Sequence, residues 1–302
     1  MIQVDRALQC ATDIAASNHS SSSQKTLCVD QNLPTQSVIG FPVSTLSFQE
    51  QVSTIISWSK LRLSKAVCVS NVHMLMEGTW KPDFAKVLKE ADMLTPDGMP
   101  LVWMTSRMSG QPQDRVAGLE LMRALCRQAA SDNVSIYFVG STDSVLLEIR
   151  RRLSEEFPSL KIAGMVSPPF RPLTVEEDLL LTRQINDSQA GLVFLSLGCP
   201  KQERWMHDRK GKVRATMIGL GGAFSVYAGV QRWAPGWVRR NGLEWLYRLA
   251  QEPGRLWRRY TETIPPFIWL AGKQLFKVRI GFSPEKSIRK TLRKYIGLFG
   301  RL

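Results

Sequence analysis

An aspartate that could act as a general base lies in residues 95–100, TPDGMP, between two apolar segments. Pro96 presets its own backbone angle, and Gly98 supplies the positive φ that such a turn needs, so Asp97 is held in place. A carboxylate fixed in this way could accept a proton from a substrate hydroxyl. Pro-Asp-Gly is also a common surface turn in which the aspartate binds its own backbone. The six residues alone favour that second interpretation.

Two further segments carry side chains that could bind a phosphate or a sugar. Arg115 comes just before an expected helix over 119–130 and could grip a phosphate through two parallel hydrogen bonds, or pair with Asp114. Gln202 lies in residues 197–203, LGCPKQE, where a glycine–proline turn follows an apolar strand. Polar side chains at the end of a strand suit sugar hydroxyls or phosphate. The alternative is a solvated first turn of a helix.

A glycine-rich segment, residues 219–224 (GLGGAF), follows another apolar strand. Gly219, Gly221 and Gly222 could let backbone amides approach a diphosphate. The segment lacks the spacing of the dinucleotide-binding and P-loop motifs, so binding of NAD or of a P-loop nucleotide loses its main support. A tight strand-to-helix turn explains the glycines equally well.

Metal ligands are scarce in the sequence. No Asp-x-Asp pair occurs, and the three histidines, His19, His73 and His207, do not have the spacing of a metal site. A transferase that neutralises a leaving diphosphate with a metal usually has carboxylates to hold it. We therefore expect no metal and no other cofactor, and we expect arginines and backbone amides to stabilise the diphosphate instead.

Short apolar segments alternate with helical stretches along the chain, and each ends at Gly, Ser or Asn. These segments are residues 65–71, 134–140, 190–198 and 213–219. The alternation predicts an α/β fold, with a parallel sheet covered by helices and an additional helix capped by Ser47. Ligands of such folds bind at the carboxyl ends of the strands. Asn71 and the glycine-containing segments would therefore line one edge of the sheet.

The chain of 302 residues carries a net charge of +14, most of it near the C-terminal end. Residues 231–302 hold 16 basic and 4 acidic residues, so the rest of the chain is nearly neutral. A basic end of this kind predicts an anionic partner. Five cysteines without a CxxC pair, no secretory signal and no apolar run of about 18 residues predict a cytoplasmic protein.

The C-terminal part has basic and apolar faces. The spacing of Arg255, Arg258 and Arg259 places them on one face of a helical turn, and residues 265–271 form an apolar patch that we expect to be exposed. A last helix from Ser283 has basic residues on one side and apolar residues on the other. This pattern is typical of a helix on an anionic membrane surface. Binding to nucleic acid and packing on the body or a partner subunit are the alternatives.

Taken in order, the motifs resemble those of the WecG/TagA/CpsF family of bacterial glycosyltransferases, over about residues 38–260. The matching pieces are Asn71, DGMP (97–100), RVAG (115–118), LGCPKQE (197–203), GLGGAF (219–224), RWAP (232–235), GLEWLYR (242–248) and EP (252–253). The resemblance implies an inverting, metal-independent enzyme with a Rossmann-like core and a C-terminal appendage. Such an enzyme moves a sugar from a UDP-sugar to a polyprenyl-diphosphate-linked saccharide in cell-surface polysaccharide synthesis.

The resemblance also implies roles for individual residues. Asp97 matches the family's proposed catalytic base. The residues that match the substrate pocket or the appendage over the acceptor's diphosphate are Asn71, Arg115, Gln202, Arg248, Arg255 and Arg258. The sequence departs from the family at Val69, where Thr is frequent, and at Ser225, where Asp is frequent. Pro96 stands where Ala is common. The first two departures leave the donor sugar open, whether of N-acetylmannosamine type or glucose type.

On this interpretation the chain has three parts: a disordered leader over residues 1–36, a catalytic α/β domain over 37–235 and a membrane-associating appendage over 236–302. The expected partners are a UDP-sugar, a lipid-linked acceptor and the anionic inner face of the cytoplasmic membrane, to which the protein would bind peripherally. A homo-oligomer stays open. The alternative function is a nucleic-acid-binding α/β protein whose basic tail supplies the affinity.

Overall fold

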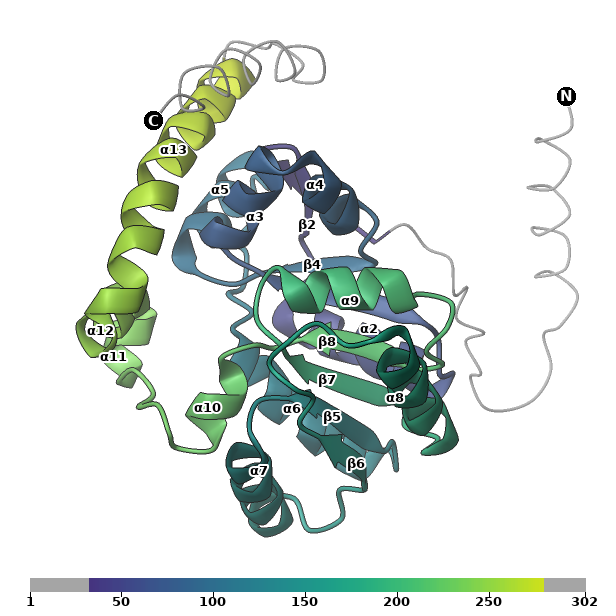
Figure 1. Ribbon diagram of the computed structural model, residues 1–302. Helices are drawn as coiled ribbons and strands as arrows, with labels where there is room; N and C mark the ends of the chain where they lie inside the picture. Colours follow the sequence, from purple (N-terminus) through teal and green to yellow (C-terminus); the bar gives the residue numbers. More distant parts are fainter. Residues whose placement is uncertain (1–32, 280–302) are drawn as a thin grey trace, which may run out of the picture. The chain divides into compact units, whose positions relative to one another are not determined.

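A parallel sheet of six strands lies at the centre of the structure, in the order β4-β3-β8-β7-β5-β6 (Figure 1). This computed structural model describes residues 33–279, so most of the expected leader and the expected last helix lie outside the described residues. The predicted α/β fold with a parallel sheet is confirmed, and the four expected segments form β3, β5, β7 and β8. The strands are β3 (Lys65–Ser70), β4 (Met93–Pro96), β5 (Ile136–Gly140), β6 (Ile162–Val166), β7 (Leu192–Ser196) and β8 (Thr216–Gly219).

The sequence pattern does not predict the two edge strands, β4 and β6. β4 ends at Pro96, and β6 contains Gly164; both residue types are unusual inside a strand. Gly164 is needed because a Cβ there would lie 2.3 Å from Cε2 of Tyr137 on the neighbouring strand. Close packing between β5 and β6 therefore requires glycine at position 164, and a glycine makes β6 harder to predict as a strand from the sequence.

Strand side chains alternate between two apolar cores, one on each face of the sheet. In β3, Val67 and Val69 face one core, whereas Ala66 and Cys68 face the other. Because both faces are covered, the strands appear in the sequence as continuous apolar runs. The first core is covered by α2 (Phe48–Lys60), α6 (Gly118–Ser131), α7 (Asp143–Glu156) and α10 (Ala223–Tyr227). The second is covered by α3 (Val72–Trp80), α4 (Pro82–Lys89), α5 (Met99–Ser109), α8 (Val175–Asp187) and α9 (Lys201–Arg209).

The expected helix start at Ser47 is confirmed. The Glu50 amide donates to the Ser47 hydroxyl at 3.3 Å, and the Glu50 carboxylate accepts the Ser47 amide at 2.8 Å. This capping box satisfies two amides that the first turn of α2 leaves without partners.

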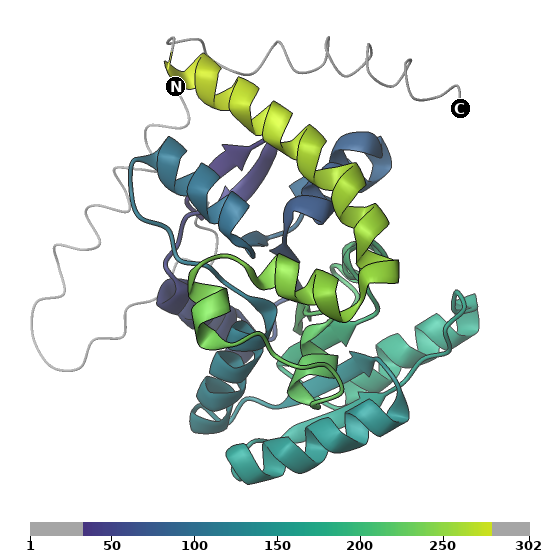
Figure 2. The ribbon, with the colours of Figure 1, turned by 90° about the vertical axis from the view of Figure 1, so that its left-hand side faces the viewer.

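After α10, the described residues form three more helices: α11 (Gly236–Arg240), α12 (Glu244–Gln251) and α13 (Pro253–Arg279). The long helix α13 packs against α3 and reaches a hairpin of β1 (Thr35–Val38) and β2 (Phe41–Ser44), as Figure 2 shows. Gln274 joins α13 to this hairpin, because its Nε2 donates to the Ser37 carbonyl at 2.6 Å and its Oε1 accepts the Ile39 amide at 2.7 Å. α13 is thus tied to the body by its packing on α3 and by the two hydrogen bonds of Gln274.

Residues 265–271 are not the exposed patch that the sequence suggests. Pro265 and Pro266 lie inside α13, and Phe267 and Ala271 are buried in the second core, while Ile268 is 63% exposed. The prediction is therefore wrong for the side of the helix that packs on the body. Across residues 33–279, no helix has the length and the apolar character that crossing a membrane requires.

Candidate active site

The carboxyl ends of neighbouring strands bring the predicted site residues to one edge of the sheet. Asn71 and Asp97 directly follow β3 and β4, which pair side by side. Gly219 ends β8, which lies between β3 and β7, and Gln202 lies in the first turn of the helix that follows β7. These four residues therefore share the edge where parallel sheets bind their ligands.

Backbone hydrogen bonds hold the Asp97 turn. The Asp97 amide donates to the Ser70 carbonyl at 2.8 Å, and the Val116 amide donates to the Pro96 carbonyl at 3.0 Å. Gly98 has a φ of 95°, the positive value that the sequence predicts. The Asp97 side chain is half-buried, and within residues 33–279 its carboxylate accepts no hydrogen bond. The bond to its own backbone that the second interpretation assumes is therefore not formed.

The surroundings of Asp97 raise its pKa from 3.8 to about 7. Burial is the main cause, because a charged carboxylate loses hydration, and the negative charge of Glu244 adds to it. Arg248 and Arg115 act in the opposite direction and lower the pKa. A carboxylate is well suited to accept a proton when its pKa is near neutral pH and no other group donates a hydrogen bond to it.

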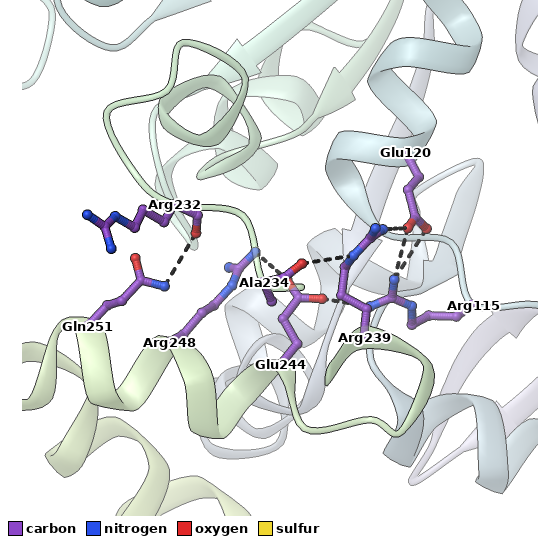
Figure 3. Close-up of polar contacts among 8 residues, drawn as sticks. All are labelled: Arg115, Glu120, Arg232, Ala234, Arg239, Glu244, Arg248 and Gln251. Carbon is purple, nitrogen blue, oxygen red and sulfur yellow. Dashed lines mark hydrogen bonds and ion pairs between the residues drawn. The ribbon is translucent and has the colours of Figure 1, made fainter. Parts of the chain in front are cut away.

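A network of ion pairs joins the body of the fold to helix α12 (Figure 3). Arg115 donates to Glu244 at 2.7 Å and to Glu120 at 3.2 Å. Arg239 donates to Glu120 at 2.5 Å, and Arg248 donates to Glu244 at 2.8 Å. Glu244 is thus held between two arginines that come from distant parts of the chain.

Arg115 is fixed by this network instead of pairing with Asp114. The Asp114 carboxylate accepts the amide of Phe48 at 2.8 Å, so the predicted alternative pair is not formed. The Arg115 side chain is only 14% exposed, and both of its terminal nitrogens are bonded to glutamates. In this arrangement Arg115 acts on Asp97 through its charge and positions α12.

Gln202 and Glu203 form a buried polar pair at the start of α9. Gln202 is 4% exposed and Glu203 is 1% exposed, so the solvated first turn considered for this segment is wrong. The Gln202 Nε2 donates to Glu203 at 2.8 Å, while its Oε1 is buried without a partner among the described residues. Burial raises the pKa of Glu203 to about 7.

The glycine loop lies directly against Gln202. A Cβ on Gly219 would lie 2.8 Å from the Gln202 Nε2, and one on Gly221 would lie 3.6 Å from its Oε1. The amides of Leu220 and Gly221 both donate to the Leu195 carbonyl, at 2.9 and 3.0 Å. The predicted cradle of amides for a diphosphate is therefore smaller than the sequence suggests, because these two amides are already bonded.

Asn71 has a structural part in the site. Its Oδ1 accepts the Met74 amide at 3.1 Å and caps α3, which leaves the Nδ2 amino group for other contacts. The same side chain can therefore fix the start of a helix and face a ligand at the edge of the sheet.

Two of the three predicted appendage arginines are mostly exposed. Arg255 pairs with Glu252, and Arg258 pairs with Glu262 at 2.7 Å; their side chains are 63% and 85% exposed. Of the three, Arg248 contributes to the charges around the half-buried aspartate. The structure thus places the charge of Arg248 near Asp97 and leaves Arg255 and Arg258 mostly exposed, although the sequence groups the three arginines together.

Arg259 is less exposed than its helical neighbours Arg255 and Arg258. Its charge acts on Cys199 and His73, which belong to the loop before α9 and to α3. The three arginines keep the helical spacing that the sequence predicts, but Arg259 is half-buried whereas Arg255 and Arg258 are exposed.

Sequence reasoning gave no role to Glu203, Glu244 or His73. The two glutamates lie inside motifs that the sequence does reveal. Glu244 stands between Leu243 and Trp245, and an acid between such neighbours is a usable signal, whereas Glu203 lies in a polar run. His73 carries no such signal; it lies two residues after Asn71 in the first turn of α3, and α13 packs against this helix. Among residues 33–279, no group of three or more His, Cys, Asp or Glu side chains could hold a metal ion.

Comparison with known proteins gives a consistent result. The family model described as "Glycosyl transferase WecG/TagA/CpsF family" matches residues 36–280. Two similar relatives share the name N-acetylglucosaminyldiphosphoundecaprenol N-acetyl-beta-D-mannosaminyltransferase. The protein of Bacillus subtilis (strain 168) is 33% identical over 178 residues, which cover 59% of this chain and 67% of the relative. That of Bacillus spizizenii (strain ATCC 23059 / NRRL B-14472 / W23) is 33% identical over 204 residues, 67% of this chain and 76% of the relative.

Proposed function

The chain belongs to the WecG/TagA/CpsF family of glycosyltransferases, and from this premise we propose that it transfers a sugar from a UDP-sugar to a polyprenyl-diphosphate-linked saccharide. The carrying observation is the half-buried Asp97 at the carboxyl edge of the sheet, with a pKa of about 7 and no internal hydrogen bond to its carboxylate. The names of the two relatives support a lipid-diphosphate acceptor and an N-acetylmannosamine-type donor. A glucose-type donor remains the second option.

The proposed reaction is a single displacement with inversion at the anomeric carbon. Asp97 accepts the proton of an acceptor hydroxyl while that oxygen forms a bond to the anomeric carbon. The bond from this carbon to the diphosphate breaks, and its electron pair leaves with UDP. Nearby guanidinium groups, Arg248 foremost, stabilise the negative charge that develops on the diphosphate.

We also propose that the reaction needs no metal and that the enzyme works at the inner face of the cytoplasmic membrane. The arginines around the site support the first point, since positive charge is available without an ion. Exposed apolar side chains on the C-terminal helices support the second, because they suit an interfacial position. These include Trp237, Trp245, Trp257 and Phe276.

The direct test is a transfer assay with the purified full-length chain. Radiolabelled UDP-N-acetylmannosamine, UDP-N-acetylglucosamine and UDP-glucose are each offered with a polyprenyl-diphosphate N-acetylglucosamine acceptor, with and without EDTA. We expect one donor to give a product of inverted anomeric configuration by NMR, at a rate that EDTA does not lower. Absence of transfer from every donor by folded protein would refute the proposed substrates, and loss of turnover in EDTA would refute metal independence.

Replacing Gly219 with alanine should weaken the enzyme by displacing Gln202. The new Cβ would lie 2.8 Å from the Gln202 Nε2 and 3.1 Å from the Met206 Cε, so the glutamine end must move. Losing one neutral hydrogen bond of ~0.5–1.5 kcal/mol should lower kcat/KM by about twofold to tenfold. A matched control is Gly272→Ala on α13, where a Cβ meets nothing within 4 Å. An unchanged kcat/KM in Gly219→Ala would remove Gln202 from the substrate site.

A further inference from the structure

A half-buried arginine without an acidic partner lies beside the Cys199 turn. The Arg259 Nε is shut off from solvent and has no hydrogen-bond partner among residues 33–279. Its neighbours differ, because Arg248, Arg255 and Arg258 each pair with a glutamate of the same helical segment. A guanidinium removed from water is unfavourable unless a negative group meets it. The position of Arg259 therefore suits an anionic ligand.

The charges that act on Arg259 also favour an anionic ligand at this position. Burial lowers the pKa of Arg259, and the charges of Arg255 and Arg248 lower it further. Within the described part of the chain, the groups acting in the other direction are Tyr260 and Cys199, and no carboxylate is among them. Because Arg248 and Arg255 are paired with glutamates, Arg259 is the guanidinium among these three whose positive charge is left to attract an anion.

Polar groups from two other helices lie around the same place. His73 in α3 is within the electrostatic reach of Arg259, and its Nδ1 is buried without a partner. Cys199 is also in reach of Arg259 and interacts with Glu203, which bonds the buried amide of Gln202. Within residues 33–279, the Arg259 Nε, the His73 Nδ1 and the Gln202 Oε1 are all buried without a partner. The charge of Arg259 reaches His73 and Cys199, and Cys199 is linked through Glu203 to Gln202.

The types of these atoms indicate the ligand. A guanidinium binds phosphate oxygens through charge-assisted hydrogen bonds. Burial lowers the pKa of His73 to about 4, so at neutral pH the ring is uncharged and can donate or accept one hydrogen bond. The Gln202 Oε1 accepts a hydrogen bond from a hydroxyl or an amide N–H. Together they fit a sugar joined to a diphosphate.

We infer that Arg259 binds a diphosphate oxygen of a substrate and that His73 contacts the sugar attached to it, together with Gln202, for which the family resemblance already implies a place in the substrate pocket. This inference rests on the proposed function and deepens it, because both the donor and the acceptor of that reaction carry a sugar diphosphate. It adds a residue of α13 that faces the body, whereas Arg255 and Arg258 point outward.

The test compares Arg259→Gln and Arg259→Lys with the wild type and with Arg151→Gln. Arg151 serves as the control because it is a half-exposed arginine of α7 with glutamate partners in its own helix. Binding of UDP and of inorganic pyrophosphate is measured by calorimetry, and KM is measured for donor and acceptor. Removing a charge-assisted hydrogen bond of ~1.5–3 kcal/mol should weaken diphosphate binding by about tenfold to a hundredfold. Arg259→Lys should retain part of the binding that Arg259→Gln loses. Arg151→Gln should have the same Kd and KM values as the wild type.

The outcomes separate the two possible diphosphates. A higher Kd for UDP in Arg259→Gln assigns the residue to the donor, whereas an unchanged Kd with a higher KM for the acceptor assigns it to the acceptor. The melting temperature adds a second criterion, since removing an unpaired buried charge should not destabilise the protein. Unchanged binding and unchanged KM values, or a lower melting temperature with unchanged binding, would overturn the inference. If the wild type transfers no sugar but Arg259→Gln still loses pyrophosphate binding, the proposed function fails and the anion site stands.

Discussion

Replacing Asp97 with asparagine should lower kcat by about 10²–10⁴-fold, the usual contribution of a positioned general base. Asparagine has nearly the same shape, so the turn held by Ser70 and Pro96 should persist. What is lost is the ability to accept the proton of the acceptor hydroxyl. KM should change much less than kcat, because the carboxyl group acts mainly in the transition state.

The pH dependence of the wild type gives the signature of this role. The pKa of Asp97 is raised to about 7, so the carboxyl group is increasingly protonated below pH 7 and cannot accept a further proton. We therefore expect kcat/KM, which reports the free enzyme, to rise with pH, to reach half of its maximum near pH 7 and to level off about one pH unit higher. The residual activity of Asp97→Asn should lack this rise. Turnover near the wild-type level, or an unchanged pH profile in the variant, would refute the assignment.

As the pH rises, the stability of the wild type should fall while its activity rises. The folded protein holds the proton of Asp97 more tightly than the unfolded chain, where the pKa is about 4. The stability gained from this proton is fully present below pH 4 and is lost as the pH rises through 7. At pH 8, Asp97→Asn should therefore melt at a higher temperature than the wild type, and the difference should shrink at pH 5. A lower melting temperature of the variant at pH 8 would show that the surroundings favour the charged form.

The Asp97 turn shows which parts of a site a sequence can reveal. Proline and glycine have backbone preferences of their own, so the shape of the turn and the positive φ at Gly98 follow from residue types alone. The alternation of apolar segments likewise predicts the parallel sheet, and the sheet fixes which segment ends share an edge. The predicted strands therefore place Asn71, Gln202 and Gly219 on the same edge, whereas the place of Asp97 depends on β4, which the sequence pattern does not predict.

What the sequence cannot reveal is the pairing of charges between distant segments. Glu244 contacts Arg115 from 129 positions away, and only the path of α12 across the site brings them together. The spacing of Arg255, Arg258 and Arg259 suggests a common face, but the packing of α13 on α3 leaves one of them inside and two outside. Helical spacing gives the angle between side chains and does not say which side of the helix is covered.

Arg115 belongs both to a motif that the sequence reveals and to an ion-pair network that it does not reveal. Replacing Arg115 with glutamine should have the second large effect. Removing its charge should raise the pKa of Asp97 further, because Arg115 normally lowers it. The rise of kcat/KM with pH should then move to higher pH. The loss of charge-assisted hydrogen bonds of ~1.5–3 kcal/mol to Glu244 and Glu120 should also loosen α12. We expect kcat/KM at pH 7 to fall by about tenfold to a hundredfold, with part of the loss recovered at pH 8.5.

Glu244→Gln is the matched test, because it should move the same pKa in the other direction. The negative charge of Glu244 raises the pKa of Asp97, so its removal should shift the rise of kcat/KM to lower pH. Both variants break the bond between Arg115 and α12, and both should lower the melting temperature. If the two pH profiles move in opposite directions while the melting temperatures fall together, the charges of the network tune Asp97. If both profiles stay at the wild-type position, the network only holds α12 in place, and burial alone sets the pKa of the base.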